Sequence, residues 1–377
     1  MGFVRSEERQ RAEIEELRRV LLACAAVHRR KDDDGIGAPP RAAPRGDDDD
    51  EDDEAGGGGG RAVCVTSGVS FLGRALVSRL LLRGYSVRIL VDNEEDMEKL
   101  REMETSGEMG SARSNFSAAV AKLGDVQSLC EAFEGCAGIF HTSAFADPAG
   151  ISGYTKAMAQ IEVKVSESVM AACTRTPSVR KCVLTSSLLA CVWRDTARNH
   201  LTNVISHDCW SDEALCASKK LWYALGKLKA EKVAWKIAEE KGLKLATICP
   251  ALITGPQFIN RNPTATIAYL KGAKEMYSDG VLATVDVTTL ADAHVRVFEA
   301  MIKTASGRYI CFDRVIDGED DAARLAGEMG MPVDKIRGGG EGESSREPRP
   351  RLELSNRKLS CLMSRSLRPC YDESRTV

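Results

Sequence analysis

The sequence is poor in the features that mark nucleic-acid-binding and membrane proteins. Aromatic residues make up only 5% of the 377 residues, and 52 basic side chains are balanced by 55 acidic ones. Without a block of Lys and Arg or an RNA-binding aromatic motif, we expect no nucleic-acid partner. The longest apolar stretch near the start, residues 20–27, is too short to cross a bilayer, so we expect no membrane association and a cytoplasmic location.

Paired cysteines and metal-ligand spacings are also missing. The chain has 13 cysteines, an odd number, and contains no C-x-x-C motif or Cys/His cluster. We therefore expect reduced thiols, no metal site and no reactive cysteine. Cys64, Cys182, Cys249 and Cys311 lie inside short apolar runs, which predicts that they pack in the core as small apolar side chains.

Residues 1–60 differ in composition from the rest of the chain. They carry 16 acids and 10 bases, with eight consecutive acids at 47–54 and five glycines at 56–60. A helical pattern covers 5–31, and the remainder has the composition of a disordered segment. We interpret 1–60 as a helix followed by a solvated, acidic spacer rather than as an interaction tail.

From Arg61 onward, short apolar runs alternate with longer amphipathic segments. This alternation is typical of a parallel sheet with crossover helices, and it predicts an α/β, Rossmann-type doubly wound fold over residues 61–250. The remaining residues, 251–377, are expected to form a smaller substrate-binding lobe and a polar tail. The expected strands are 62–66, 86–91, 118–123, 138–141, 182–185 and 245–250, followed in the lobe by helices at 265–274 and 289–303 and a strand at 308–312.

The segment after the first expected strand has the position of a phosphate-binding loop. It reads SGVSFLG and precedes a helix expected at 74–83, whose N-terminal N–H groups and dipole favour an anion. In the G-x-x-G-x-x-G spacing known for dinucleotide-binding loops, Ser67 and Ser70 stand where glycines are usual. The residues predicted to surround a pyrophosphate are Ser67, Gly68, Ser70, Phe71, Leu72 and Gly73.

An acid ends the second expected strand. Asp92 lies 19 residues after Gly73, near the spacing at which a carboxylate binds the adenosine ribose. Such a carboxylate favours NAD, because it would repel the 2′-phosphate of NADP. Arg88 could offset that repulsion, so the choice between NAD and NADP stays open.

Tyr223 and Lys227 lie four residues apart at the start of a helix expected to run to Lys241, and so share one face. An ammonium about 4 Å from a phenol contributes about 4 kcal/mol at an effective dielectric near 20, enough to lower its pKa by about three pH units. Ser187, at the end of the fifth expected strand, would hold a carbonyl oxygen. Tyr223 would then protonate that oxygen while the cofactor delivers hydride.

The ordered set VCVTSGVSFLG, GCAGIFHTSA, VRKCVLTSSLLACVW, DCWSDE, LWYALGKLKAEKVAW and CPALITGP resembles the plant cinnamoyl-CoA reductase-like and dihydroflavonol reductase-like branch of extended short-chain dehydrogenases/reductases, over about residues 61–312. The resemblance implies catalytic roles for Ser187, Tyr223 and Lys227, NADP as cofactor, and an aromatic carbonyl or acyl-CoA substrate. It further implies cofactor contacts from Asp125, Val126, Thr142, Ser143, Ala144, Pro250 and Ile253.

The chain departs from this branch at the catalytic helix, where cinnamoyl-CoA reductases have N-W-Y-C-Y-G-K and this chain has L-W-Y-A-L-G-K. We therefore predict an NAD(P)H-dependent reductase of a phenylpropanoid-type carbonyl compound. Two alternatives stay open: a non-catalytic dinucleotide-binding or interaction protein, and an epimerase or dehydratase that retains NAD. The sequence predicts neither the exact substrate nor the oligomeric state.

Overall fold

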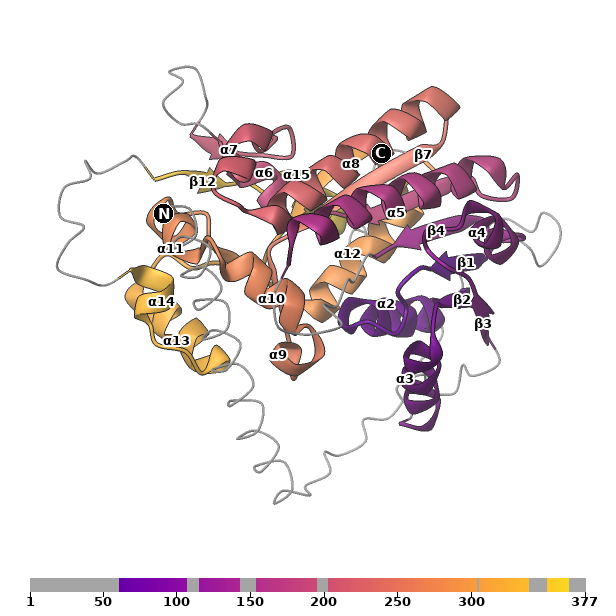
Figure 1. Cartoon of the computed structure of the whole chain (residues 1–377), viewed down its shortest axis with the longest axis horizontal. Coiled ribbons are helices and arrows are strands. Elements are labelled where there is room, and N and C mark those ends of the chain that lie inside the picture. The colour runs from indigo at the N-terminus through magenta and orange to yellow at the C-terminus, as the bar shows by residue number, and fades with distance from the viewer. Residues whose placement is uncertain are drawn as a thin grey trace, which may run out of the picture.

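A seven-stranded parallel sheet forms the centre of the computed structural model, in the order β10-β7-β5-β4-β1-β2-β3 (Figure 1). The structure describes residues 61–106, 115–142, 154–194, 203–303, 305–338 and 351–365. The sheet strands are β1 (Ala62–Val65), β2 (Ser86–Val91), β3 (Phe116–Val120), β4 (Gly138–His141), β5 (Lys181–Thr185), β7 (Lys244–Pro250) and β10 (Gly307–Cys311). The expected doubly wound fold is confirmed, whereas the expected helix and acidic spacer of residues 1–60 lie outside the described residues.

Two sequence predictions about this sheet need correction. It has seven strands rather than six, because β10, which we expected in the lobe, pairs with β7. Strand β3 covers Phe116–Val120 instead of 118–123, since its register is set by pairing with residues 87–91 of β2. The chain therefore leaves the sheet after β7 and returns to its edge more than fifty residues later.

Helices cover both faces of the sheet. On one face, α4 (Val126–Phe133), α5 (Lys156–Arg175) and α8 (Trp222–Lys241) pack on a core that includes Cys64 of β1. On the other face, α2 (Phe71–Leu82) and α12 (Val287–Ala300) pack on Val63 and Val65. Figure 1 shows α5 and α8 running side by side, in agreement with their extensive contacts.

The predicted core cysteines are confirmed. Cys64, Cys182, Cys249 and Cys311 are all buried, with at most 2% of their surface exposed. Each lies on a sheet strand.

The segments outside the sheet form short helices and two small sheets. The expected helix at 265–274 is wrong: it is split into α10 (Pro263–Leu270) and α11 (Ala273–Ser278). At the break, a side chain on Gly272 would meet the ring of Trp193 at 2.3 Å. The other elements are α3 (Glu94–Thr105), α6 (Leu189–Val192), β6 (Val204–Ile205), α7 (Glu213–Ser218), β8 (Leu252–Thr254), α9 (Phe258–Arg261), β9 (Ala283–Asp286), β11 (Arg314–Val315), α13 (Glu319–Met329), α14 (Asp334–Arg337), β12 (Glu353–Leu354) and α15 (Arg357–Arg365). Across the described ranges, no helix combines the length and the apolar character that a membrane crossing needs.

A buried ion pair connects helix α8 to the edge of the sheet. Arg308 on β10 donates to both carboxylate oxygens of Glu231, at 2.7 and 3.2 Å. The same carboxylate accepts hydrogen bonds from the hydroxyl of Thr247 on β7, at 2.7 Å, and from that of Ser186 after β5, at 2.6 Å. Because Glu231 is fully buried, these four hydrogen bonds replace its hydration.

We predict that Glu231→Gln lowers the free energy of unfolding by ~3 kcal/mol, because Arg308 then keeps a buried charge without its counter-charge. The double variant Glu231→Gln/Arg308→Met, which removes both charges, should recover at least half of this loss. Urea unfolding measures both. Glu213→Gln, at the more exposed pair with Lys232, is the control and should change stability by less than about 0.5 kcal/mol. Equal losses in Glu231→Gln and the control would contradict the prediction.

Candidate active site

A cleft of about 760 Å³, including its open mouth, lies at the carboxyl ends of the sheet strands. It receives Thr142 from the end of β4, Ser187 from the end of β5 and Pro250 from the end of β7. Helices α2, α8 and α10 line its other walls. Successive strands are added on one side of β1 up to β3 and on its other side from β4 onward, so the strand order switches between β1 and β4, the position at which open α/β sheets bind ligands.

The loop between β1 and α2 has the geometry of an anion-binding turn without left-handed residues. Ser70 caps α2: its hydroxyl accepts from the N–H of Gly73, at 3.1 Å, and donates to the carbonyl of Ser67, at 2.7 Å. In the described residues, the non-glycine residues with positive φ are Lys220 and Gln257, so both loop serines have ordinary backbone angles. Serine can therefore replace glycine at 67 and 70 without backbone strain.

Gly73 has no such freedom. A Cβ atom there would lie 1.9 Å from the carbonyl oxygen of Ser67 and 2.8 Å from the backbone of Gly68. The loop folds back onto the first turn of α2 at this point, so the backbone leaves no room for a side chain. Phe71 and Leu72, between the serine cap and Gly73, line the cleft.

The other expected cofactor residues divide into three groups. Thr142, Pro250 and Ile253 line the cleft, and the buried hydroxyl of Thr142 has no hydrogen-bond partner in the described part of the chain. Asp92 follows β2, and Asp125 caps α4 by accepting from two N–H groups, with Val126 beginning that helix. Ser143 and Ala144 lie outside the described residues.

The predicted role of Arg88 in cofactor binding is wrong. Its guanidinium donates to the carbonyls of Ala132 and Glu134 at the end of α4, both at 2.7 Å. These bonds hold the guanidinium at the C-terminal end of α4, which leads into the amino end of β4 and so lies opposite to the carboxyl edge where Asp92 follows β2. Arg88 therefore no longer counts among the cofactor residues. Partial burial, and then Asp96, raise the pKa of the Asp92 carboxyl.

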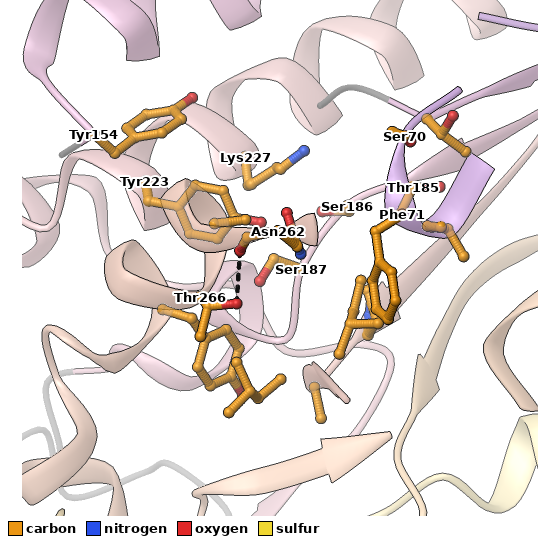
Figure 2. A pocket seen from close by; sticks show the side chains of 18 of the residues that line it. Ser70, Phe71, Tyr154, Thr185, Ser186, Ser187, Tyr223, Lys227, Asn262 and Thr266 are labelled. Carbon is orange, nitrogen blue, oxygen red and sulfur yellow. Dashed lines mark hydrogen bonds between the residues drawn. The ribbon is translucent and has the colours of Figure 1, made fainter. Parts of the chain in front are cut away.

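Ser187, Tyr223 and Lys227 all line the same cleft (Figure 2). The hydroxyl of Ser187 accepts from the N–H of Leu189 at 3.2 Å and is thereby oriented at the start of α6. Tyr223 and Lys227 lie one turn apart on α8, with the ammonium 5.7 Å from the centre of the phenol ring. The structure thus brings together the three residues that the sequence assigned to catalysis.

The sequence analysis missed a buried carboxylate beside them. Glu162 on α5 pairs with Lys227, with Oε1 2.5 Å from Nζ, and both side chains are at most 5% exposed. The phenol of Tyr154 donates to the other oxygen, Oε2, and its ring meets that of Tyr223 edge-on at 5.0 Å. Asn262, Thr266 and Tyr269 from the lobe complete the cleft, with the Thr266 hydroxyl donating to the Asn262 carbonyl (Figure 2).

The electrostatics of Tyr223 differ from the sequence expectation. Burial raises the pKa of the phenol, Lys227 lowers it, and Glu162 raises it further, so that the net shift is upward. Burial opposes the charge of Lys227, but Glu162 and Tyr223 more than compensate and raise the pKa of the ammonium. The expected acidification of Tyr223 is therefore wrong for this protein as folded, because the ammonium is buried together with a carboxylate.

A nicotinamide dinucleotide fits the donor groups at this edge. The loop from Ser67 to Gly73 presents backbone N–H groups at the start of α2, where a pyrophosphate is favoured. The Thr142 hydroxyl is a buried polar group left for a ligand, and Lys227 lies deeper in the cleft. The Ser70 hydroxyl is directed back to the Ser67 carbonyl within the loop.

Comparison with known proteins agrees with this arrangement. Residues 64–312 match the 3-beta hydroxysteroid dehydrogenase/isomerase family. The chain belongs to this family. Cinnamoyl-CoA reductase 1 of Petunia hybrida is 38% identical over 265 residues, which cover 69% of this chain and 75% of the relative. Tetraketide alpha-pyrone reductase 1 of Arabidopsis thaliana is 31% identical over 279 residues, covering 72% and 83%.

Solved structures share the fold. Vestitone reductase from alfalfa superposes with a TM-score of 0.57 at 23% identity, over 84% of this chain and 94% of its own. Yeast Gre2, complexed with NADPH, gives a TM-score of 0.58 at 21% identity, over 80% and 93%. Family and relatives together identify an NAD(P)-dependent oxidoreductase of the extended short-chain type, which confirms the resemblance recognised in the sequence.

We predict that Gly73→Ala weakens dinucleotide binding at least tenfold, because the new methyl group must displace the carbonyl of Ser67 and hence the loop. Titration with NADH and NADPH, followed by fluorescence, measures the effect. Gly327→Ala, in helix α13 and with open space around the new methyl group, is the control and should bind as the wild type does. Unchanged binding in Gly73→Ala would show that this loop does not hold the cofactor.

Proposed function

We propose that the protein reduces an aromatic carbonyl compound of phenylpropanoid type, with the reaction carried out by Ser187, Tyr223 and Lys227. The observation that carries the proposal is the convergence of these three side chains in one cleft, beside the loop suited to a pyrophosphate. They come from β5 and α8, which are separated in sequence from that loop by more than one hundred residues.

Each residue has a distinct task. Ser187 is oriented by the N–H of Leu189 and donates its own proton to the substrate carbonyl oxygen. Tyr223 gives its proton to the same oxygen as negative charge develops there. Lys227 keeps its charge in the buried site and orients the phenol. A bound nicotinamide dinucleotide supplies the hydride for the carbonyl carbon.

A second cavity supports the aromatic substrate class. It has a volume of about 400 Å³ and shares Tyr154, Tyr223 and Tyr269 with the main cleft. Its remaining walls include the rings of Trp193 and Trp222 and the side chains of Leu189, Leu221 and Ile267. Flat, apolar walls next to the proton donor favour a substrate whose aromatic ring lies close to its carbonyl group.

We predict that Tyr223→Phe lowers kcat at least a thousandfold and leaves the affinity for NADH or NADPH within a factor of three. The change removes the donated proton but keeps the ring and its packing. Steady-state assays with a panel of cinnamaldehydes, cinnamoyl-CoA esters and dihydroflavonols measure kcat, and fluorescence titration measures affinity.

Two outcomes would contradict the proposed function. One is absence of turnover with the whole panel by wild-type protein that binds the dinucleotide. The other is turnover unaffected by Tyr223→Phe. Purification with tightly held NAD, visible in the absorbance spectrum, would favour the epimerase or dehydratase alternative instead.

We further propose that the cofactor preference depends on Asp92, at the end of β2. A carboxylate there repels a 2′-phosphate and accepts hydrogen bonds from ribose hydroxyls, so NADH should bind more tightly than NADPH. Asp92→Asn should reduce this preference about tenfold. Glu94→Gln, an exposed acid two residues further on, is the matched control and should leave it unchanged. Calorimetric titration measures the affinities, and tighter binding of NADPH by the wild type would contradict the prediction.

A further inference from the structure

We propose that Glu162 is a positioning residue that sets the proton affinity of Tyr223, by holding Lys227 in place and cancelling part of its charge. The inference rests on the proposed role of Tyr223 as proton donor. It concerns a residue outside the predicted catalytic set and explains why a buried carboxylate lies beside that set.

The close approach of α5 and α8 brings the carboxylate to the lysine. At Gly226, a side chain would lie 2.9 Å from the Tyr154 hydroxyl and 3.1 Å from Cα of Ala159. Because Gly226 has no side chain, the two helices pack tightly at this point. Gly226 directly precedes Lys227 on α8, and its neighbour Ala159 lies one turn before Glu162 on α5. The resulting ion pair is fixed by backbone packing and not by flexible surface side chains.

Tyr154 fixes the other side of the carboxylate. Its phenol donates to Oε2 of Glu162, while Lys227 contacts Oε1, so both oxygens have a strong partner. The Tyr154 ring lies edge-on to Tyr223, at an angle of 77° between the ring planes. Glu162 thus belongs to the same packed group as the proposed proton donor.

Only two members of this group carry charge in the neutral pH range. Burial, and then Lys227, lower the pKa of His141 to about 3, so this imidazole is neutral. Burial raises the pKa of Tyr154, with Glu162 adding to the shift, and burial also raises the pKa of Tyr269, which faces Tyr223 from α10. The charge acting on Tyr223 from these described neighbours is therefore that of Lys227 and Glu162 together.

These two charges nearly cancel while Tyr223 is a phenol. Loss of its proton would leave the buried group with a net negative charge, which a low-dielectric site disfavours. Tyr223 therefore keeps its proton into the alkaline range, as a proton donor for carbonyl reduction needs. Alcohol oxidation starts from the phenolate and carbonyl reduction from the phenol, so Glu162 holds the free enzyme in the protonation state from which reduction starts.

Charge-removal variants of the pair test the inference. Glu162→Gln leaves the charge of Lys227 uncancelled and should lower the pKa of Tyr223 by about two pH units, a shift of the size that one nearby unit charge produces in a buried site. Lys227→Met should raise this pKa. The double variant, in which neither charge remains, should titrate within about half a pH unit of the wild type.

The readout is ¹⁹F NMR of the full chain labelled with 3-fluorotyrosine, whose phenol ionises at lower pH than tyrosine. The chain has seven tyrosines, and the Tyr223 signal is the one missing from Tyr223→Phe. Glu167→Gln, an exposed acid on the same helix, is the control and should not shift the titration. If Glu162→Gln does not fold, Lys227→Met is compared with the double variant. The pKa of Tyr223 should be lower in the double variant, because the negative charge of Glu162 is then absent.

The inference would be overturned if the pKa of Tyr223 in Glu162→Gln were equal to or higher than in the wild type. Equal pKa values of Tyr223 in Lys227→Met and in the double variant would also overturn it. The titration needs neither substrate nor cofactor. Failure of the reductase assays therefore leaves this result intact, while turnover without the titration shift would remove the role of Glu162 and keep the proposed function.

Discussion

Helix α8 carries two buried charged residues, Lys227 and Glu231, one turn apart, and each needs a counter-charge from another element. A buried charge without a partner costs several kcal/mol, so α8 can dock only where both partners are present. Glu162 arrives from α5 and Arg308 from the edge strand β10, which hold the helix from two sides. Tyr223 lies one turn before Lys227, so its distance from the ends of the strands is set by these two pairs. Strand β10 supplies the counter-charge on this side: without Arg308, Glu231 would be buried beside uncharged groups alone, the hydroxyls of Ser186 and Thr247 and the thiol of Cys249.

The loop between β1 and α2 shows which part of a glycine motif is steric and which is conformational. Ser67 and Ser70 occupy glycine positions of the family spacing, yet neither has a positive φ. Ser70 also caps the helix, a role glycine fills less well, since its hydroxyl satisfies the Gly73 N–H. Gly73 is different because it lies against the backbone of the loop itself, where any side chain would overlap another atom. Glycine is therefore needed at position 73, where a side chain would not fit. At positions 67 and 70 the backbone angles are open to any residue, and serine replaces glycine there.

The sequence was sufficient to predict the sheet and the meeting of Ser187, Tyr223 and Lys227 at its edge, because strand periodicity and a Tyr-x-x-x-Lys pair are local patterns. It could not predict that β10 joins the sheet, since that pairing depends on a segment that follows several short lobe elements. Arg88 was misassigned because spacing along a strand places a residue but does not determine which carbonyls its long side chain will find. Glu162 had a detectable signal. It shares helical spacing with Val165 and Val169 on the core side of α5, where a carboxylate indicates a buried partner, but the identity of that partner depends on the contact between α5 and α8.

A buried phenol with a raised pKa is compatible with the role of proton donor that we propose for Tyr223. The oxygen that receives the proton becomes an alkoxide as hydride arrives, and alkoxides have proton affinities comparable to that of hydroxide and far above that of a phenolate. Each pH unit between donor and acceptor corresponds to about 1.4 kcal/mol, so proton transfer from Tyr223 remains favourable even when burial makes the phenol less acidic than it is in water. Acidification by an isolated lysine matters more for the reverse reaction, in which the phenolate must exist before an alcohol can be oxidised. A site that buries a carboxylate with its lysine therefore keeps Tyr223 protonated, the state in which a proton donor for carbonyl reduction begins the reaction.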